Sequence, residues 1–139
     1  MLGKTAVKRR LVAGTGWKMN NGVADALRYG VELQARIASL DVSGLDLFVL
    51  PPFTSLHAAA TSLAGSTVAI GGQNMHWEDS GGWTGEISAP MLREAGCRYV
   101  ELAHSERLQH FAENYPLVRL KVDKALLSGL TPIICLGET

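Results

Sequence analysis

The sequence predicts an α/β fold in which a parallel sheet is covered by helices. Two observations lead to this prediction: short apolar runs alternate with longer amphipathic segments, and the short runs are apolar at consecutive positions. Strands that are buried on both faces have this unbroken apolar character, and helices connect neighbouring parallel strands. An open, doubly wound sheet and a closed (β/α) barrel both agree with the pattern, and composition does not distinguish them.

The first two strands and helices are identified by their spacing and their ends. A brief apolar run at 11–13 predicts the first strand, and apolar residues at helical spacing over 24–38 predict the helix after it. The β-favouring run at 45–50 is the second expected strand, because Pro51 stops it. A helix of small residues is expected over 54–63, with a threonine or serine as its cap.

The middle of the chain contains a strand followed by a long polar loop. The third expected strand, 67–70, ends at Gly71–Gly72, which we interpret as a turn. The glycine-rich loop over 73–86 is longer than the roughly two to six residues that are common between a strand and a helix. Its Trp77 and Trp83 indicate a partner surface, or else they fold back on their own domain.

The last part of the chain repeats the alternation. A short helix at 88–95 precedes a fourth strand at 99–103, and a helix that begins near Val118 and is closed by Gly129 precedes a fifth strand at 131–136. The predicted order is therefore β-α-β-α-β-α-β-α-β. No GxGxxG follows the first strand, which argues against the dinucleotide-binding version of an open sheet.

Composition excludes several classes of partner. The 139 residues are enough for one domain with a core, and 13 basic residues balance 13 acidic ones. A neutral chain has no global field for nucleic acid or an anionic membrane, so we expect neither as a partner. No apolar run approaches the roughly 20 residues that span a bilayer, and no signal peptide is recognised. We interpret Cys97 and Cys135 as reduced thiols of a cytoplasmic protein, with a disulfide as the alternative.

Two residues at predicted strand ends are candidates for chemistry, because both architectures collect active sites at the carboxyl ends of their strands. Lys18 follows the first strand, where an ammonium holds an anionic substrate or stabilises developing negative charge; a solvated surface lysine is the alternative. His104 follows the fourth strand, before a helix whose N-terminus disfavours a charged imidazole, so a neutral ring there donates to a carbonyl. A structural histidine is the alternative. Glu106 either begins that helix or pairs with Lys18.

Other motifs carry no catalytic prediction. His57, His76 and His110 fall within helices or the long loop, and we expect none of them to be catalytic. The sequence has no helix with two histidines at zinc-binding spacing, no GxSxG elbow and no P-loop lysine after its paired glycines. We therefore predict no metal site.

Five segments in order along the chain carry a family resemblance: 16–20 (GWKMN), 73–79 (QNMHWED), 83–88 (WTGEIS), 104–107 (HSER) and 132–139 (PIICLGET). Together they resemble triosephosphate isomerase. The resemblance implies a TIM (β/α)8 barrel, of which residues 1–139 form the N-terminal portion of a single domain, about the first four and a half βα units. It also implies a cytoplasmic homodimer without a cofactor. The implied reaction, which belongs to glycolysis and gluconeogenesis, interconverts glyceraldehyde 3-phosphate and dihydroxyacetone phosphate through an enediol.

The resemblance also implies roles for individual residues. Lys18 resembles the lysine that neutralises the phosphate and the oxyanion of the substrate. His104 resembles the neutral histidine that polarises the carbonyl and moves protons between oxygens. Ser105 and Glu106 resemble the residues that support the histidine and the lysine. The implied dimer interface contains a loop tip that enters the neighbouring subunit, with Thr84, Trp83 and Trp77.

Four positions depart from the family pattern. Gly16, which we keep in the expected substrate-binding set, replaces an asparagine beside the substrate and so removes one hydrogen bond. Ala103 replaces a glycine, Leu108 an arginine and Glu101 an apolar residue. The altered first loop and the 100–102 segment resemble a related group that acts on four-carbon ketose phosphates. An isomerase of erythrulose phosphate is therefore the main alternative.

The largest departure concerns the general base. In the family this base is a glutamate after the sixth strand, with the closing lid and main phosphate loops after strands six to eight, and none of the glutamates up to Thr139 matches that motif. We expect the chain alone to turn over substrate poorly, and a complementing C-terminal half to complete the barrel. A non-catalytic half-barrel fragment that associates, and a phosphate-binding domain of an open α/β fold, are the other hypotheses. The barrel interior is expected to contain Val12, Val49, Ile70, Leu102 and Ile134.

Overall fold

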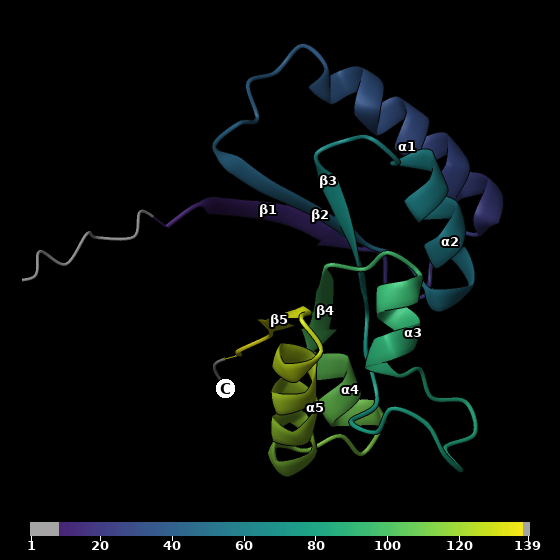
Figure 1. Ribbon diagram of the computed structural model, residues 1–139, viewed down its shortest axis with the longest axis vertical. Coiled ribbons are helices and arrows are strands. Elements are labelled where there is room, and N and C mark those ends of the chain that lie inside the picture. The colour runs from purple at the N-terminus through teal and green to yellow at the C-terminus, as the bar shows by residue number, and fades with distance from the viewer. Residues whose placement is uncertain (1–8, 138–139) are drawn as a thin grey trace, which may run out of the picture.

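The computed structural model describes residues 9–137, in which five strands alternate with helices (Figure 1). In chain order the elements are β1 (Leu11–Gly16), α1 (Val23–Ile37), β2 (Leu45–Leu50), α2 (Phe53–Ser62), β3 (Val68–Gly72), α3 (Ala89–Glu94), β4 (Tyr99–Leu102), α4 (Ser105–His110), α5 (Tyr115–Leu127) and β5 (Thr131–Ile134). All the predicted elements are present, and two helices, α4 directly after β4 and then α5, stand where the predicted order has one. Glu138 and Thr139, the end of the last motif, lie outside the described residues.

The sheet is parallel throughout, and its strands follow one another in chain order, β1-β2-β3-β4-β5. An open doubly wound sheet reverses its strand order at a switch point, whereas a barrel adds each strand beside the previous one. The observed order is therefore that of half a (β/α)8 barrel. This confirms the predicted fold class, and the open-sheet hypothesis is wrong.

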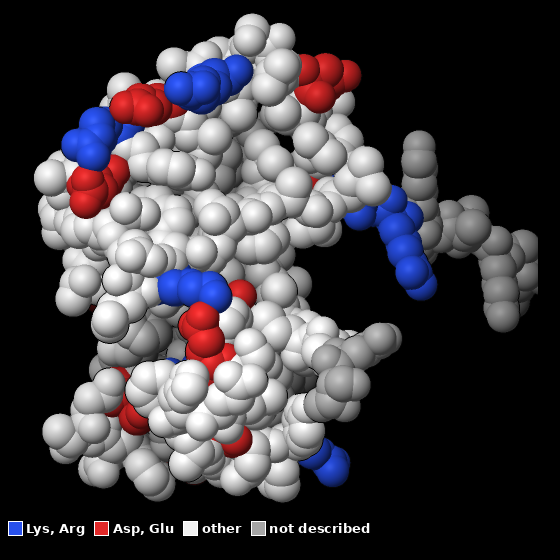
Figure 2. All heavy atoms as spheres, turned by 180° about the vertical axis from the view of Figure 1, so that it is seen from behind, with Lys and Arg blue, Asp and Glu red and all other residues white. Residues whose placement is uncertain are grey.

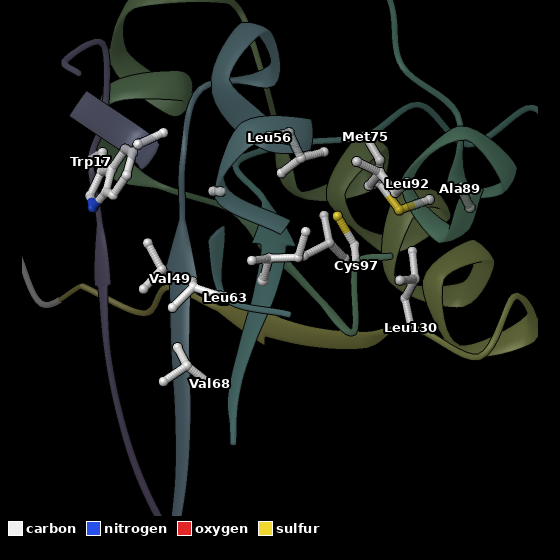
Figure 3. Close-up of a cluster of buried hydrophobic side chains, with 14 of the residues drawn as sticks. Trp17, Val49, Leu56, Leu63, Val68, Met75, Ala89, Leu92, Cys97 and Leu130 are labelled. Atoms are coloured by element: carbon white, nitrogen blue, oxygen red, sulfur yellow. The ribbon is translucent and has the colours of Figure 1, made fainter. Parts of the chain in front are cut away.

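The hydrophobic core lies between the sheet and its helices (Figure 3). Val49 of β2 and Ile70 of β3 are paired in the strand register, so their side chains leave the same face of the sheet. Both are buried in one cluster with Leu102 of β4 and with Leu56 and Ala59 of α2. Burial of this face fixes the sheet against its crossover helices and leaves the opposite face to form the barrel interior.

The prediction for the barrel interior is wrong for most of its residues. Val49, Ile70 and Leu102 face the helices, and Ile134 is paired with Leu102 and shares that face. Val12 is the exception, because the register places it on the same face as Gly14, where it is 58% exposed. Strands that are apolar at consecutive positions carry no alternation, so the sequence does not indicate which side chains point inward. The strand registers and close contacts instead assign to the interior Gly14, Gly16, Phe48, Leu50, Gly71, Tyr99 and Glu101.

Gly71 and Gly72 belong to β3 and do not form the predicted turn. Gly71 is paired with Tyr99, and Gly72 is paired with Val100. A β-carbon on Gly71 would lie 2.6 Å from the Tyr99 carbonyl oxygen, so a larger residue would push β3 away from β4. The two glycines therefore extend β3 and pair its carboxyl end with the first two residues of β4.

Helices α1 and α2 approach each other closely at Gly30. A β-carbon on Gly30 would lie 2.0 Å from Ser62 Oγ and 3.0 Å from the Ser62 carbonyl carbon. Ser62 Oγ lies 3.1 Å from the carbonyl oxygens of both Ala26 and Ala59. The hydroxyl therefore has hydrogen-bond partners that it would lose by turning away.

The overpacking caused by Gly30→Ala should cost about 1–3 kcal/mol of the free energy of unfolding. This loss should exceed the gain of about 1 kcal/mol that alanine brings to a helix interior. Urea unfolding followed by circular dichroism measures the difference. Gly44→Ala is the control, because a β-carbon at Gly44 would meet nothing within 4 Å. An unchanged or higher urea midpoint for Gly30→Ala would contradict the close contact.

The surface carries charges of both signs. Figure 2 shows basic and acidic side chains interspersed along the top of one face, where α1 lies, above a broad uncharged region. On α1, Arg28 and Asp25 form an ion pair of 2.5 Å. No helix within residues 9–137 is long and apolar enough to cross a membrane.

Candidate functional site

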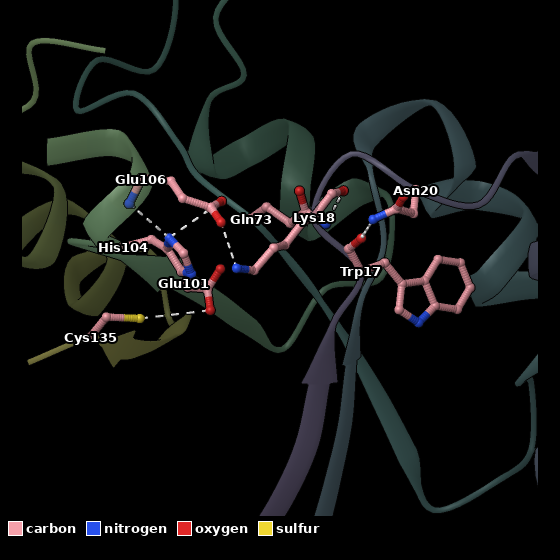
Figure 4. Close-up of polar contacts among 8 residues, drawn as sticks. All are labelled: Trp17, Lys18, Asn20, Gln73, Glu101, His104, Glu106 and Cys135. Carbon is pink, nitrogen blue, oxygen red and sulfur yellow. Dashed lines mark hydrogen bonds and ion pairs between the residues drawn. The ribbon is translucent and has the colours of Figure 1, made fainter. Parts of the chain in front are cut away.

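Lys18 and His104 lie together at the edge of the sheet where the carboxyl ends of β1 and β4 meet (Figure 4). Both line one hollow of about 230 Å³, together with Gln73, Glu101 and Glu106. Pockets for drug-sized molecules measure roughly 300–1,000 Å³, so this hollow has the size for a small metabolite. The two residues selected from the sequence are thus brought together by the fold.

The backbone at Lys18 is strained and is held by neighbouring groups. Its φ of 54° lies in the left-handed region, which costs a non-glycine residue roughly 1–2 kcal/mol. Gln73 Nε2 donates to the Lys18 carbonyl at 2.9 Å and to the Leu50 carbonyl at 2.8 Å. The Trp17 N–H donates to the same Leu50 carbonyl at 3.0 Å. Gln73 thus positions the backbone of Lys18, a role that the sequence analysis did not predict. Its place directly after β3, at the carboxyl edge of the sheet, could have indicated a residue of the site.

Glu106 pairs with Lys18, which was one of the two interpretations of this residue. Lys18 Nζ donates to Glu106 Oε1 at 2.5 Å, and both side chains are about half exposed. The hydrogen bond and charge of Glu106 raise the pKa of Lys18, and the hydrogen bond from Lys18 lowers the pKa of Glu106. The hollow therefore holds an ammonium group whose position is fixed by a carboxylate.

The Lys18–Glu106 pair should be visible in the titration of Glu106. Because the pKa of Glu106 is lowered in the folded chain, the pair stabilises the fold above the ordinary value of 4.5 and is lost as the pH falls through the lowered value. At the alkaline end, the raised pKa of Lys18 keeps the pair intact below 10.5 and until the pH rises through the raised value. Lys18→Met should raise the pKa of Glu106 toward 4.5 in a carbon-13 NMR titration.

Lys124→Met is the control for this titration. Lys124 Nζ pairs with Asp79 at 2.7 Å, outside the hollow, so its loss should leave the pKa of Glu106 where it is. If the Glu106 carboxyl titrates identically with and without the Lys18 ammonium, the ion pair does not form in solution.

His104 caps helix α4 with its side chain. Nδ1 accepts a hydrogen bond from the Glu106 N–H at 3.2 Å, so this nitrogen carries no proton, and the neutral ring carries its proton on Nε2. Glu106 Oε2 lies 3.7 Å from Nδ1, but an accepting nitrogen forms no ion pair with it. Ala103 is buried with a left-handed φ of 62°, which turns the chain sharply between β4 and His104. The alanine that replaces the family's glycine thus occupies a conformation that glycine favours.

A buried ion pair lies behind the hollow and was not predicted. Lys121 of α5 donates to Asn74 Oδ1 at 2.8 Å and also to Glu113 Oε1, and all three residues are buried. Arg107 Nε lies 3.5 Å from the same Glu113 oxygen. The network joins the loop after β3 to α4 and α5, so it supports both sides of the hollow. Its members come from separate segments and form no local motif, which is why the sequence does not indicate it.

Two other predicted site residues lie close to the hollow. Gly16 is the last residue of β1, and a β-carbon there would lie 3.7 Å from the Glu101 carboxylate. Ser105 is exposed and lines an adjacent hollow of about 290 Å³ with His104 and Leu136. Ser105 is therefore beside the histidine and outside the Lys18 hollow.

The aromatic residues of the long loop gather around one histidine. His76 is buried and stacks with Trp77 and Trp83 at centroid distances of 4.0 and 4.3 Å. This agrees with the interpretation that both tryptophans fold back on their own domain. Thr84 is exposed, and Trp83 remains 46% exposed. These surfaces stay available to a partner, and the dimer interface stays a prediction.

Both cysteines are free. Burial raises the pKa of Cys97 to about 12. Burial and the nearby Glu101 carboxylate raise the pKa of Cys135 to about 11. Both groups are therefore thiols at neutral pH and poor nucleophiles, in agreement with the absence of a catalytic assignment.

The parallel half-barrel and its strand-end hollow define a (β/α)-barrel protein with an enzyme-like site. The family model for triosephosphate isomerase matches residues 11–139. The L-erythrulose-1-phosphate isomerase of Mesorhizobium japonicum is 47% identical over 126 residues, which cover 91% of this chain and 49% of that protein. The triosephosphate isomerase of Herpetosiphon aurantiacus is 46% identical over 132 residues, which cover 95% of this chain and 52% of that protein.

A solved structure agrees with these matches. The crystal structure of triosephosphate isomerase from Bartonella henselae superimposes with a TM-score of 0.81 at 40% identity and covers 94% of this chain and 52% of that one. The chain belongs to the triosephosphate isomerase family. It spans about half the length of the curated relatives it matches.

Proposed function

We propose that this chain is the N-terminal portion of a single TIM-barrel domain that isomerises a small sugar phosphate. The convergence of the Lys18 ammonium and the neutral His104 imidazole on one hollow carries the proposal. The M. japonicum and H. aurantiacus relatives are both isomerases by name. A cytoplasmic location, which the two free thiols favour, belongs to the same proposal.

The two side chains are suited to enediol chemistry. A base removes a proton from the carbon next to a carbonyl, and the carbonyl oxygen gains negative charge. The Nε2–H of His104 donates to that oxygen, while the Lys18 ammonium attracts both the oxygen and the phosphate. Glu106 holds the lysine in place. His104 gives its Nε2 proton to the carbonyl oxygen, which becomes a hydroxyl, and takes back the proton of the hydroxyl on the neighbouring carbon, which becomes the new carbonyl. Return of the first proton to the former carbonyl carbon completes the isomerisation. We assign the base to a complementing C-terminal half, as the family pattern implies.

Of two substrate classes, we favour a four-carbon ketose phosphate. Gly16 and Glu101, which depart from the triosephosphate isomerase pattern, meet beside the hollow. The relatives named L-erythrulose-1-phosphate isomerase include that of M. japonicum, at 47% identity, and that of Mycolicibacterium smegmatis, at 44%. Glyceraldehyde 3-phosphate and dihydroxyacetone phosphate, the pair expected from the sequence, are the second candidate, supported by the H. aurantiacus relative at 46%.

A homodimer remains part of the proposal. The exposed Thr84 and the half-exposed Trp83 would meet the partner subunit, and Trp77 contacts Trp83 edge to face. The aromatic stack around His76 gives this loop a defined shape without a partner. A rigid, partly apolar loop loses little conformational entropy on association.

The test is an isomerase assay on a completed barrel, defined as this chain joined at Thr139 to the half of the M. japonicum relative that it does not match. We expect the completed barrel to isomerise L-erythrulose 1-phosphate and to incorporate solvent deuterium next to the carbonyl. A polypeptide of these 139 residues alone should show no turnover above background. A folded completed barrel that isomerises neither this compound nor dihydroxyacetone phosphate would contradict the proposal.

A further inference from the structure

Glu101 is an acidic side chain on the inner face of the half-barrel, between the two proposed catalytic residues. It lies on β4 and lines the same hollow as Lys18 and His104. Figure 4 shows its carboxylate beside the imidazole, with the lysine ammonium approaching from the other side. The enediol chemistry described above does not use this group. Because a half-buried carboxylate loses hydration, its presence here needs a compensating interaction.

Gly16 provides the space into which Glu101 reaches. A β-carbon at Gly16 would lie 3.7 and 3.8 Å from the two carboxylate oxygens. These are ordinary contacts for a single carbon, but the outer atoms of an asparagine at this position would need the space that the carboxylate occupies. The glycine and the glutamate are therefore sterically coupled, and the two departures from the family pattern complement each other.

The Glu101 carboxylate keeps hydrogen-bonding capacity for a ligand. Lys18 Nζ is bonded to Glu106. Within residues 9–137, the side-chain hydrogen bond to Glu101 comes from Cys135, with Sγ 3.7 Å from Oε1. A thiol is a weak donor, and an ionised carboxylate accepts about four hydrogen bonds. Most of this capacity therefore faces the hollow, where the donors of a bound sugar are its hydroxyl groups.

We propose that Glu101 contacts the substrate and accepts a hydrogen bond from the additional hydroxyl of a four-carbon ketose phosphate, in the space left by Gly16. This inference rests on the proposed function. A triose phosphate has one hydroxyl-bearing carbon fewer and leaves the carboxylate without this donor, which penalises the shorter sugar. The negative charge of Glu101 also repels the phosphate, so the substrate is oriented with its phosphate away from this residue.

The specificity ratio of the completed barrel tests this role. The ratio is kcat/KM for L-erythrulose 1-phosphate divided by kcat/KM for dihydroxyacetone phosphate. Glu101→Ile should lower the ratio by roughly 10- to 100-fold, mainly through the four-carbon substrate. Glu101→Gln keeps an acceptor oxygen and should lower the ratio less. Adding Gly16→Asn to Glu101→Ile should lower it further, by raising kcat/KM for the triose phosphate.

Glu94→Gln is the matched control, because Glu94 is an exposed glutamate on α3 and should leave the ratio unchanged. Equal losses for both substrates after Glu101→Ile would assign Glu101 a structural role and overturn the proposal, as would a ratio within about threefold of the original. If the unmodified completed barrel turns over neither compound, the proposed function fails. The role of Glu101 is then tested by calorimetry, as the ratio of the dissociation constants for L-erythrulose 1-phosphate and dihydroxyacetone phosphate before and after Glu101→Ile. An unchanged ratio, or binding of neither compound, then overturns the role of Glu101.

Discussion

Replacing His104 by asparagine should lower kcat of the completed barrel by roughly 10²–10⁴-fold, the usual contribution of a positioned general acid or base. Asparagine keeps an acceptor for the Glu106 N–H, so helix α4 retains its N-terminal cap. The variant loses the imidazole and, with it, the Nε2–H to which the proposed mechanism assigns polarisation of the carbonyl. Because the Lys18 ammonium still attracts the phosphate, KM should change much less than kcat. Steady-state kinetics with L-erythrulose 1-phosphate measures both constants.

His57→Ala is the control for this variant. His57 is exposed on α2 and does not line the hollow, so its removal should leave kcat unchanged. Circular dichroism should show that both variants melt as the unmodified protein does. Full isomerase activity in a folded His104→Asn variant would remove the histidine from the mechanism.

Replacing Lys121 by methionine should lower the free energy of unfolding by about 3–5 kcal/mol, because the change leaves an unpaired charge in the interior. The side chain of Glu113 is 2% exposed, and its Oε2 has no hydrogen-bond partner within residues 9–137. Arg107 Nε, at 3.5 Å from Oε1, is too distant to compensate fully. Urea unfolding of the 139-residue chain measures the loss.

A double variant, Lys121→Met with Glu113→Leu, tests the same prediction even if the single variant does not fold. Apolar replacement of a whole buried ion pair is often neutral, so the double variant should recover most of the lost stability. Arg119→Met on the same helix, where the arginine is 84% exposed, should change stability by less than about 0.5 kcal/mol. A Lys121→Met variant as stable as the original would show that Glu113 is not an isolated buried charge.

The positions of Lys18 and His104 could be predicted from the sequence because they depend on one local rule. Each follows a recognisable apolar run, and parallel strands bring their carboxyl ends to the same edge. The pairing of Glu106 with Lys18 could be predicted by the same rule, because Glu106 follows His104 at the carboxyl end of β4 and so lies at the same edge as Lys18. Local order along the chain was thus sufficient for the central residues of the site.

Other features depend on information that is not local. Val49 and Leu50 are both apolar and both buried, yet they lie on opposite faces of β2, so only the packed structure separates barrel interior from helix-facing core. The sequence predicts a turn at Gly71 because glycine usually marks turns. In the structure Gly71 lies within a strand, and a glycine is required there because the Tyr99 carbonyl approaches closely. The Lys121–Glu113 pair likewise requires knowledge of which helices meet behind the hollow.

The two hydrogen bonds of Gln73 have a consequence for the reaction energetics. One side-chain nitrogen is shared between the carbonyls of Lys18 and Leu50, so hydrogen bonds tie together the first loop, the second strand and the third loop. A charged group on such a support does not reorient when a substrate arrives. In the proposed isomerisation, the work of ordering this support is therefore done during folding and is not added to the activation barrier.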